Sequence, residues 1–113
     1  MLSRGNRVTT ADEFRAVVRR GRRVSTCAGV YYFLPADALA PARFGFIVSR
    51  AVGSAVTRNL LRRRLRAVAR ELVDSGMLGR DIVIRPLPAA PRLSFGELRA
   101  DVVSALAPRR VPA

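Results

Sequence analysis

The chain has 113 residues, of which half are hydrophobic and 26% charged, enough apolar surface for one domain core and too much for intrinsic disorder. Its 21 basic residues, all arginine, outnumber 8 acidic ones and give a net charge of +13, so we expect an anionic partner. The absence of histidine and the presence of one cysteine, Cys27, exclude a Ser-His-Asp triad, a Cys-His pair, a zinc cluster and an internal disulfide.

A capping box opens the first predicted helix, over residues 11–20. Thr10 and Glu13 have the T-x-x-E spacing at which each side chain accepts a hydrogen bond from the other residue's backbone N–H. Three apolar residues follow at i, i+3 and i+4, namely Phe14, Val17 and Val18. Because Gly21 comes next, we expect a short amphipathic helix that ends there.

Three later stretches have the composition of strands. Residues 24–34 are rich in β-branched and aromatic side chains and end before Pro35, and residues 43–49 resume this character after a loop. We expect these two stretches to pair as an antiparallel hairpin. Residues 81–85 are mostly apolar, which is typical of a strand buried inside a sheet.

The strongest helical pattern covers residues 54–75. Its apolar face consists of Leu61, Leu65, Val68 and Leu72, and a glycine stands near each end of the segment. A neighbouring face is polar and cationic, and it consists of Arg58, Asn59, Arg62, Arg63, Arg66 and Arg70. We therefore expect one side of this helix to pack on the core and the next side to carry positive charge.

A second capping box, formed by Ser94 and Glu97, opens the last predicted helix. Its apolar face consists of Phe95, Leu98, Val102 and Leu106. The predicted order is therefore helix, strand, strand, helix, strand and helix, with room for one strand to be divided in two.

The arginines from Arg58 to Arg66 point to nucleic acid. Five like charges in nine residues repel one another along a helix, and Asp37 is the one carboxylate between Glu13 and Glu71. The helix also begins without an acidic residue, which leaves its N-terminal N–H groups and its dipole available to a phosphate. Because a bound polyanion would relieve the repulsion, we interpret this face as a binding surface rather than a solvated one.

Aromatic residues on the predicted strands favour single-stranded RNA over a duplex. Side chains alternate between the two faces of a strand, so part of this set packs inward while another part is open to unpaired bases: Tyr31, Tyr32, Phe33, Phe44 and Phe46. For each residue taken singly, core packing is the alternative. No helix pair with the short turn of a helix-turn-helix motif is visible.

An ordered set of motifs surrounds the arginine run. Val48-Ser-Arg-Ala-Val-Gly-Ser-Ala-Val56 precedes Arg58-Asn59, and Arg4-Gly-Asn-Arg7, Asp12-Glu-Phe14, Gly21-Arg22 and Asp81-Ile-Val-Ile-Arg85-Pro86 lie elsewhere. Over roughly residues 4–106, this set resembles the protein component of bacterial ribonuclease P. Leu60 stands where that family usually has arginine, and Ala51 where a second basic residue is common.

The resemblance implies an α+β fold: a two-layer α/β sandwich of three helices and a mixed sheet of four strands, with a left-handed βαβ crossover. It implies a subunit that assists a catalytic RNA, which removes the 5′ leader of precursor tRNA with bound Mg²⁺. The residues implied to contact that RNA are Arg58, Asn59, Arg62, Arg63 and Arg66, with Arg70 on the same face. Those implied to contact the leader, in and beside a cleft between the first helix and the sheet, are Phe14, Val18, Tyr32, Ser49 and Arg50.

Two other functions remain open from the residues alone. A small basic ribosomal or nucleoid protein would bind nucleic acid without raising a cleavage rate. A protein-only magnesium nuclease would need acidic pairs such as Glu71 and Asp74, which share a helix face but more simply bond to Arg70 or to solvent.

No segment is typical of a signal peptide or a bilayer span. We therefore expect one cytoplasmic domain over residues 1–113, with ribonuclease P RNA and precursor tRNA as partners and with no membrane, small-molecule substrate or protein-bound metal. Cys27 lies in an apolar stretch and is expected to be a small buried residue.

Overall fold

Four strands form one mixed sheet in the order β1-β2-β4-β3, in a computed structural model that describes residues 2–107. The strands are β1 (Arg22–Ser25), β2 (Gly29–Pro35), β3 (Arg43–Phe46) and β4 (Arg80–Pro86). β1 with β2 and β2 with β4 are antiparallel, whereas β3 and β4 are parallel. The central strand β4 buries Ile82, Val83 and Ile84, which confirms the prediction of a strand inside the sheet.

Three helices cover the sheet, and both capping boxes form as predicted. They are α1 (Ala11–Arg20), α2 (Ala55–Asp74) and α3 (Phe95–Leu106). Thr10 caps α1 with Glu13, and Ser94 caps α3 with Glu97. Short 3-10 turns lie at η1 (Arg4–Asn6), η2 (Arg50–Val52) and η3 (Ala90–Arg92). No helix in residues 2–107 combines the length and apolar character needed to cross a membrane.

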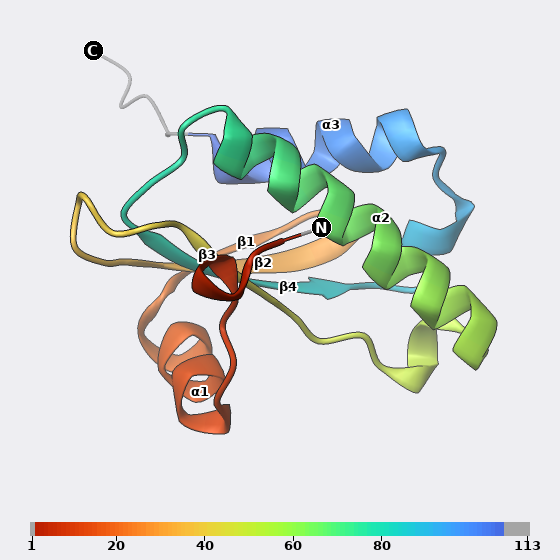
Figure 1. Cartoon of the computed structure of the whole chain (residues 1–113). Helices are drawn as coiled ribbons and strands as arrows, with labels where there is room; N and C mark the ends of the chain where they lie inside the picture. Colours follow the sequence, from red (N-terminus) through yellow and green to blue (C-terminus); the bar gives the residue numbers. More distant parts are fainter. Residues whose placement is uncertain (1, 108–113) are drawn as a thin grey trace, which may run out of the picture.

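The helices lie on both faces of the sheet (Figure 1). α2 and α3 pack over one face on a cluster that includes Tyr31, Phe44, Ile82 and Ile84, together with the predicted apolar faces of both helices. α1 lies on the opposite face, where Val17 packs with residues of β2 and β4. The predicted α+β fold of three helices and a four-stranded mixed sheet is confirmed, and α1 adds a partial layer to the sandwich of the sheet with α2 and α3.

The connection from β3 through α2 to β4 is left-handed. The Phe44 side chain lies in the cluster under α2, while its carbonyl accepts a hydrogen bond from the Val8 N–H at 2.9 Å, on the edge of β3 that faces away from β4. For an L-residue, this places β4 to the left of β3 when the sheet is viewed from α2 with β3 pointing up. The crossover that the resemblance implied is therefore present, against the right-handed rule for such units.

One predicted strand is divided in two, as the predicted element order left room for, and the predicted hairpin is wrong. Residues 24–34 do not form one strand, because a turn after Ser25 divides the stretch and the Thr26 N–H bonds to the Gly29 carbonyl at 2.8 Å. This turn joins β1 and β2 as the hairpin, whereas β3 pairs with β4 and not with β2. Gly29 is the one strong turn former in the segment, so composition did not mark the break.

Cys27 is also a correction, since it is exposed in this turn rather than buried. The hydroxyl groups of Thr26 and Tyr31 bind Asp101 of α3. Asp101 Oδ2 accepts a hydrogen bond from Thr26 Oγ1 at 2.8 Å and from the Tyr31 hydroxyl at 2.5 Å. Burial of Tyr31, followed by its bond to Asp101, raises the pKa of the Tyr31 hydroxyl. The turn is therefore fixed by polar contacts to α3, with the thiol left outside.

Candidate nucleic-acid interface

The arginine face of α2 consists of Arg58, Asn59, Arg62, Arg63, Arg66 and Arg70, as predicted from its spacing. Arg58 and Arg62 are half-buried and the other four residues are exposed. In residues 2–107, Arg70 is the only member with an ion pair, to Asp74 at 3.7 Å. The remaining guanidinium groups have no carboxylate partner there, which leaves their charge available to a polyanion.

Local contacts orient part of this face. Asn59 Oδ1 accepts a hydrogen bond from Arg62 Nη1 at 2.9 Å, one turn along the helix. Arg64, which belongs to the same basic run, instead donates to the Leu93 carbonyl at 3.3 Å on another side of α2. Arg64 therefore does not replace the arginine that the family usually has at the position of Leu60, which is exposed here.

The N-terminus of α2 carries no acidic residue in its first turn. Gly53 precedes it with φ 141°, a backbone conformation that favours glycine, and Ser54 caps the helix by accepting from the Thr57 N–H at 3.3 Å. No carboxylate in the first turn neutralises the positive end of the helix dipole, so this end favours the binding of a phosphate.

A shallow groove of about 340 Å³ runs beside α1, and we call it the α1 groove. Its walls are Phe14, Arg15, Val18 and Arg19 of the helix, with Ile47 from the segment after β3. Phe14 and Val18 had been predicted to contact a leader, and the structure brings them together in this one groove. Sequence reasoning missed Arg15 and Arg19, although their i, i+4 spacing beside Phe14 and Val18 was a usable signal, and it had no signal for Ile47.

Gly45 of β3 makes room for Phe14. A Cβ atom at this position would lie 2.5 Å from two atoms of the Phe14 ring and 3.1 Å from the Val8 Cβ. Only glycine therefore allows the Phe14 ring to come this close to the strand in its present position.

The other predicted leader residues do not line the α1 groove. Tyr32 is 7% exposed and packs with Val17, Val30 and Val83 beneath α1, so core packing accounts for it better than base stacking. Ser49 and Arg50 are exposed at η2, shortly after Ile47 along the chain. A contact between them and an RNA strand in the groove stays a prediction.

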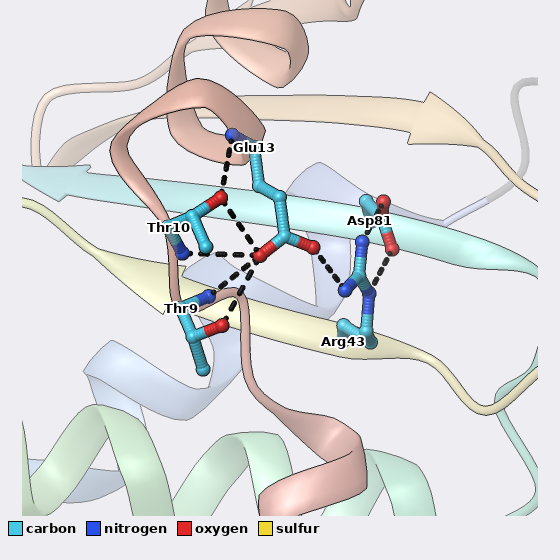
Figure 2. Close-up of polar contacts among 5 residues, drawn as sticks. All are labelled: Thr9, Thr10, Glu13, Arg43 and Asp81. Atoms are coloured by element: carbon cyan, nitrogen blue, oxygen red, sulfur yellow. Dashed lines mark hydrogen bonds and ion pairs between the residues drawn. The ribbon is translucent and has the colours of Figure 1, made fainter.

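Glu13 anchors the start of α1 to the sheet (Figure 2). Its Oε1 accepts from the Thr10 N–H at 3.0 Å and its Oε2 pairs with Arg43, whose guanidinium also binds both oxygens of Asp81 at 2.9 and 2.8 Å. The hydrogen bond from the Thr10 backbone, followed by that from Arg43, lowers the pKa of Glu13 to about 2. The bond to Asp81 is the largest contribution that raises the pKa of Arg43. This network ties the helix of the groove to β3 and β4.

The arginine face and the α1 groove meet at a small cavity of about 140 Å³, which we call the junction cavity. Arg66 of α2 and Phe14 of α1 both line it, together with Phe46 and Arg7. Arg7 is held there by a hydrogen bond from its Nη2 to the Leu2 carbonyl at 2.8 Å. These residues are far apart in sequence, so no local pattern could have placed the two predicted surfaces side by side.

Each of the eight acidic residues has an intramolecular contact. The contacts are Asp12 with Arg15, Glu13 and Asp81 with Arg43, Asp37 with the Leu39 N–H, Glu71 with Arg99, Asp74 with Arg70, Glu97 with Ser94, and Asp101 with Tyr31. Glu71 and Asp74, the acidic pair considered for a nuclease site, therefore form surface ion pairs with two different arginines. Across residues 2–107, no group of three metal-ligating side chains occurs.

Comparison with known proteins places these surfaces in context. Residues 2–108 match the family model of ribonuclease P. The ribonuclease P protein component of Clavibacter michiganensis is 49% identical over 106 residues, which are 94% of each chain. A Staphylococcus aureus RNase P protein mutant with defective mRNA degradation activity has the same fold, with a TM-score of 0.82 and 24% identity over 89% of this chain and 85% of that one. The RNase P protein of Thermotoga maritima, in complex with 1-(4-fluorophenyl)-2-thiourea, is also similar, with a TM-score of 0.79. The two sequences are 26% identical, and the match covers 88% of this chain and 96% of that one.

Proposed function

Because this chain belongs to the ribonuclease P protein family, we propose that its arginine face binds the catalytic RNA and that its α1 groove binds the 5′ leader of precursor tRNA. As a member of this family, the chain is a protein subunit of a tRNA-processing endoribonuclease, and its partner is ribonuclease P RNA. In the proposal, the RNA subunit cleaves the phosphodiester bond and the protein positions the substrate in the cytoplasm, where precursor tRNA is made.

The observation that carries the proposal is the junction cavity. Arg66 of the arginine face and Phe14 of the α1 groove line the same cavity, so an RNA on one surface lies next to a strand on the other. Guanidinium groups suit phosphates, while a half-buried aromatic ring suits an unpaired base. One small domain can therefore hold the leader beside the catalytic RNA.

The role of this chain in catalysis is positional and electrostatic. Mg²⁺ would supply the activated water and neutralise charge at the scissile phosphate. We assign its binding to the RNA subunit and the substrate, because residues 2–107 bring together no group of three metal-ligating side chains. Arginines near the RNA interface would lower the Mg²⁺ concentration that the complex requires, since they neutralise phosphates that Mg²⁺ would otherwise screen.

Reconstitution tests the proposal directly. The full chain is added to a bacterial ribonuclease P RNA at low Mg²⁺, and correct 5′ cleavage of precursor tRNA is measured. We expect the cleavage rate to rise and the Mg²⁺ requirement to fall. A ribosomal protein of similar size and charge is the control, because equal stimulation by that protein would mean that positive charge alone is responsible. No change in rate or Mg²⁺ requirement would contradict the proposed function and leave a non-catalytic RNA-binding role.

A further inference from the structure

A second cationic cavity, of about 570 Å³, lies at one end of the sheet, and we call it the distal basin. Arg20 at the end of α1, Arg22 of β1 and Arg80 of β4 line it, over a floor that includes Phe33 and Pro35 of β2. The volume falls within the range of small-molecule and cofactor sites, so one nucleotide can enter it. None of these residues belongs to the arginine face, the α1 groove or the junction cavity.

Strand register explains why these side chains converge. Arg22 lies opposite Phe33 in the β1–β2 pair, and Arg80 lies opposite Pro35 in the β2–β4 pair. Residues directly opposite in an antiparallel pair share a face, and so do Phe33 and Pro35 at i and i+2. The arginines of both neighbouring strands therefore lie on the same face of the sheet as the apolar floor.

The charge of the distal basin is not balanced by a carboxylate in the described part of the chain. Neither Arg20 nor Arg22 makes a side-chain hydrogen bond or an ion pair within residues 2–107, and Arg80 has no carboxylate partner there. Arg80 is instead fixed by two neutral groups, since its Nη1 donates to the Leu106 carbonyl at 2.8 Å and its guanidinium lies 5.6 Å from the Phe33 ring centroid. Three like charges beside an aromatic ring suit a phosphate with its base.

A cationic path connects the distal basin with the α1 groove. Arg15 and Arg19 line both the groove and a shallow hollow on α1, and Arg20 lines both this hollow and the basin. Arg15 is paired with Asp12 at 2.9 Å, whereas Arg19 has no ion pair in the described part of the chain. From Phe14 to Arg20 the path rises about 9 Å along α1 and turns about 240° around the helix. It then rounds the end of the sheet, because Phe33 and Arg80 of the basin lie on the face that α2 and α3 cover.

We propose that the distal basin is a second site for single-stranded RNA, which takes a leader nucleotide upstream of those held in the α1 groove. Arg20, Arg22 and Arg80 bind its phosphates, while its base lies against exposed Pro35, next to the Arg80 guanidinium that covers the Phe33 ring. This inference rests on the proposed function, because it assumes a leader in the groove. If the distal basin contacts the RNA subunit instead of the leader, the experiment must distinguish that outcome.

Leader length is the variable that tests the distal basin. Precursor tRNAs whose leaders grow by one nucleotide at a time are bound to the reconstituted complex, with the wild-type chain or with Arg20→Gln/Arg22→Gln. With the wild type, we expect affinity to rise once when the leader fills the groove and again when it reaches the basin. The double variant should lose the second, several-fold gain and keep the first, together with wild-type cleavage of short-leader substrates.

Arg23→Gln is the matched control. Arg23 is next to Arg22 and equally charged, but it lies opposite Tyr32 and so points to the other face of the sheet. It should leave the second gain in place, and all variants should keep the wild-type Tm. The single variant Arg22→Gln is measured beside Arg23→Gln. Equal losses at every leader length would overturn the inference in favour of a contact with the RNA subunit, and equal losses in the single variants Arg23→Gln and Arg22→Gln would overturn it in favour of overall charge. The absence of a second gain in affinity with the wild type would also overturn it. Cleavage of short-leader substrates reports separately on the proposed function.

Discussion

Glu13 shows how one carboxylate can set the position of a binding groove. It completes the capping box of α1 and pairs with Arg43, which in turn holds Asp81 on β4. The sequence predicted the capping role from spacing, but the ion pair depends on α1 lying against β3. The same residue therefore stabilises the helix locally and fixes the helix to the sheet.

Glu13→Gln should reduce the pH dependence of stability at low pH. The pKa of Glu13 is lowered from 4.5 to about 2 in the folded chain, so its stabilising effect is present above pH 4.5 and is lost as the pH falls towards 2. Glutamine keeps the capping geometry without the charge. We expect the variant to have a lower Tm than the wild type at pH 7 and a similar Tm at pH 2, measured by circular dichroism.

Asp12→Asn is the control for that comparison. Asp12 precedes Glu13 and pairs with Arg15 on the surface, where an ion pair contributes only about 0–1 kcal/mol. Its Tm should follow that of the wild type. A difference between wild type and Glu13→Gln that stays constant from pH 7 to pH 2 would show that the charge of Glu13 does not contribute.

Gly45→Ala should disturb the α1 groove through Phe14. The added methyl group would overlap the Phe14 ring, so the ring has to move out of its present position, at a cost of about 1–3 kcal/mol in stability for an overpacked site. We expect weaker binding of substrates with a leader and unchanged binding of leaderless tRNA. Gly5→Ala is a matched control, because a Cβ there meets nothing within 4 Å. An equal loss for leaderless tRNA would mean that the change spreads beyond the groove.

At the scale of elements, α2 divides its surface between two tasks. Leu61, Leu65 and Val68 are buried against the sheet and α3, whereas the arginine face is turned away from that core. Because four of the six members of the arginine face are exposed, charge there can change with little loss of packing. This separation lets a single helix be both a structural element and a binding surface.

Arg62→Ala/Arg66→Ala should weaken binding to ribonuclease P RNA and leave the Tm nearly unchanged. Neither arginine has an ion pair in residues 2–107, and the bond from Arg62 to Asn59 is at the surface. Each lost phosphate contact should reduce the slope of log affinity against log salt by about 0.7–0.9. Titration of the RNA at several salt concentrations measures this slope.

Arg64→Ala is the control within the same helix. It removes an equal charge, but Arg64 is turned towards the Leu93 carbonyl. Compared with the single variant Arg66→Ala, it should have little effect on RNA affinity. If the two single variants weaken binding equally, net charge rather than the arginine face determines affinity.

The whole molecule carries a charge of +13, so repulsion among its arginines opposes folding in the absence of RNA. Added NaCl screens this repulsion over about 10 Å at 0.1 M. We therefore expect the Tm of the free protein to rise with NaCl while its affinity for RNA falls. The Arg62→Ala/Arg66→Ala variant should show a smaller rise. A Tm that falls with NaCl would mean that the ion pairs outweigh the repulsion.

Periodicity and capping boxes were sufficient to predict all three helices, and composition was sufficient for the central strand. These signals are local: a capping box spans four residues and a helical face repeats within two turns. The arginine face was predicted for the same reason, since its members are neighbours on one helix. The hairpin was mispredicted because strand partners are chosen by packing across the sheet, which composition does not encode.

By itself, the sequence determined that the chain has one cationic helix face, a basic excess that suits RNA, and a family likeness. Only the tertiary structure decided that Tyr32 lies in the core, that Arg66 meets Phe14 at the junction cavity, and that Arg20, Arg22 and Arg80 converge on the distal basin. The physical reason is distance along the chain. Charge and amphipathicity follow from residues a few positions apart, whereas a cavity is formed by residues that only the packing of helices on a sheet brings together.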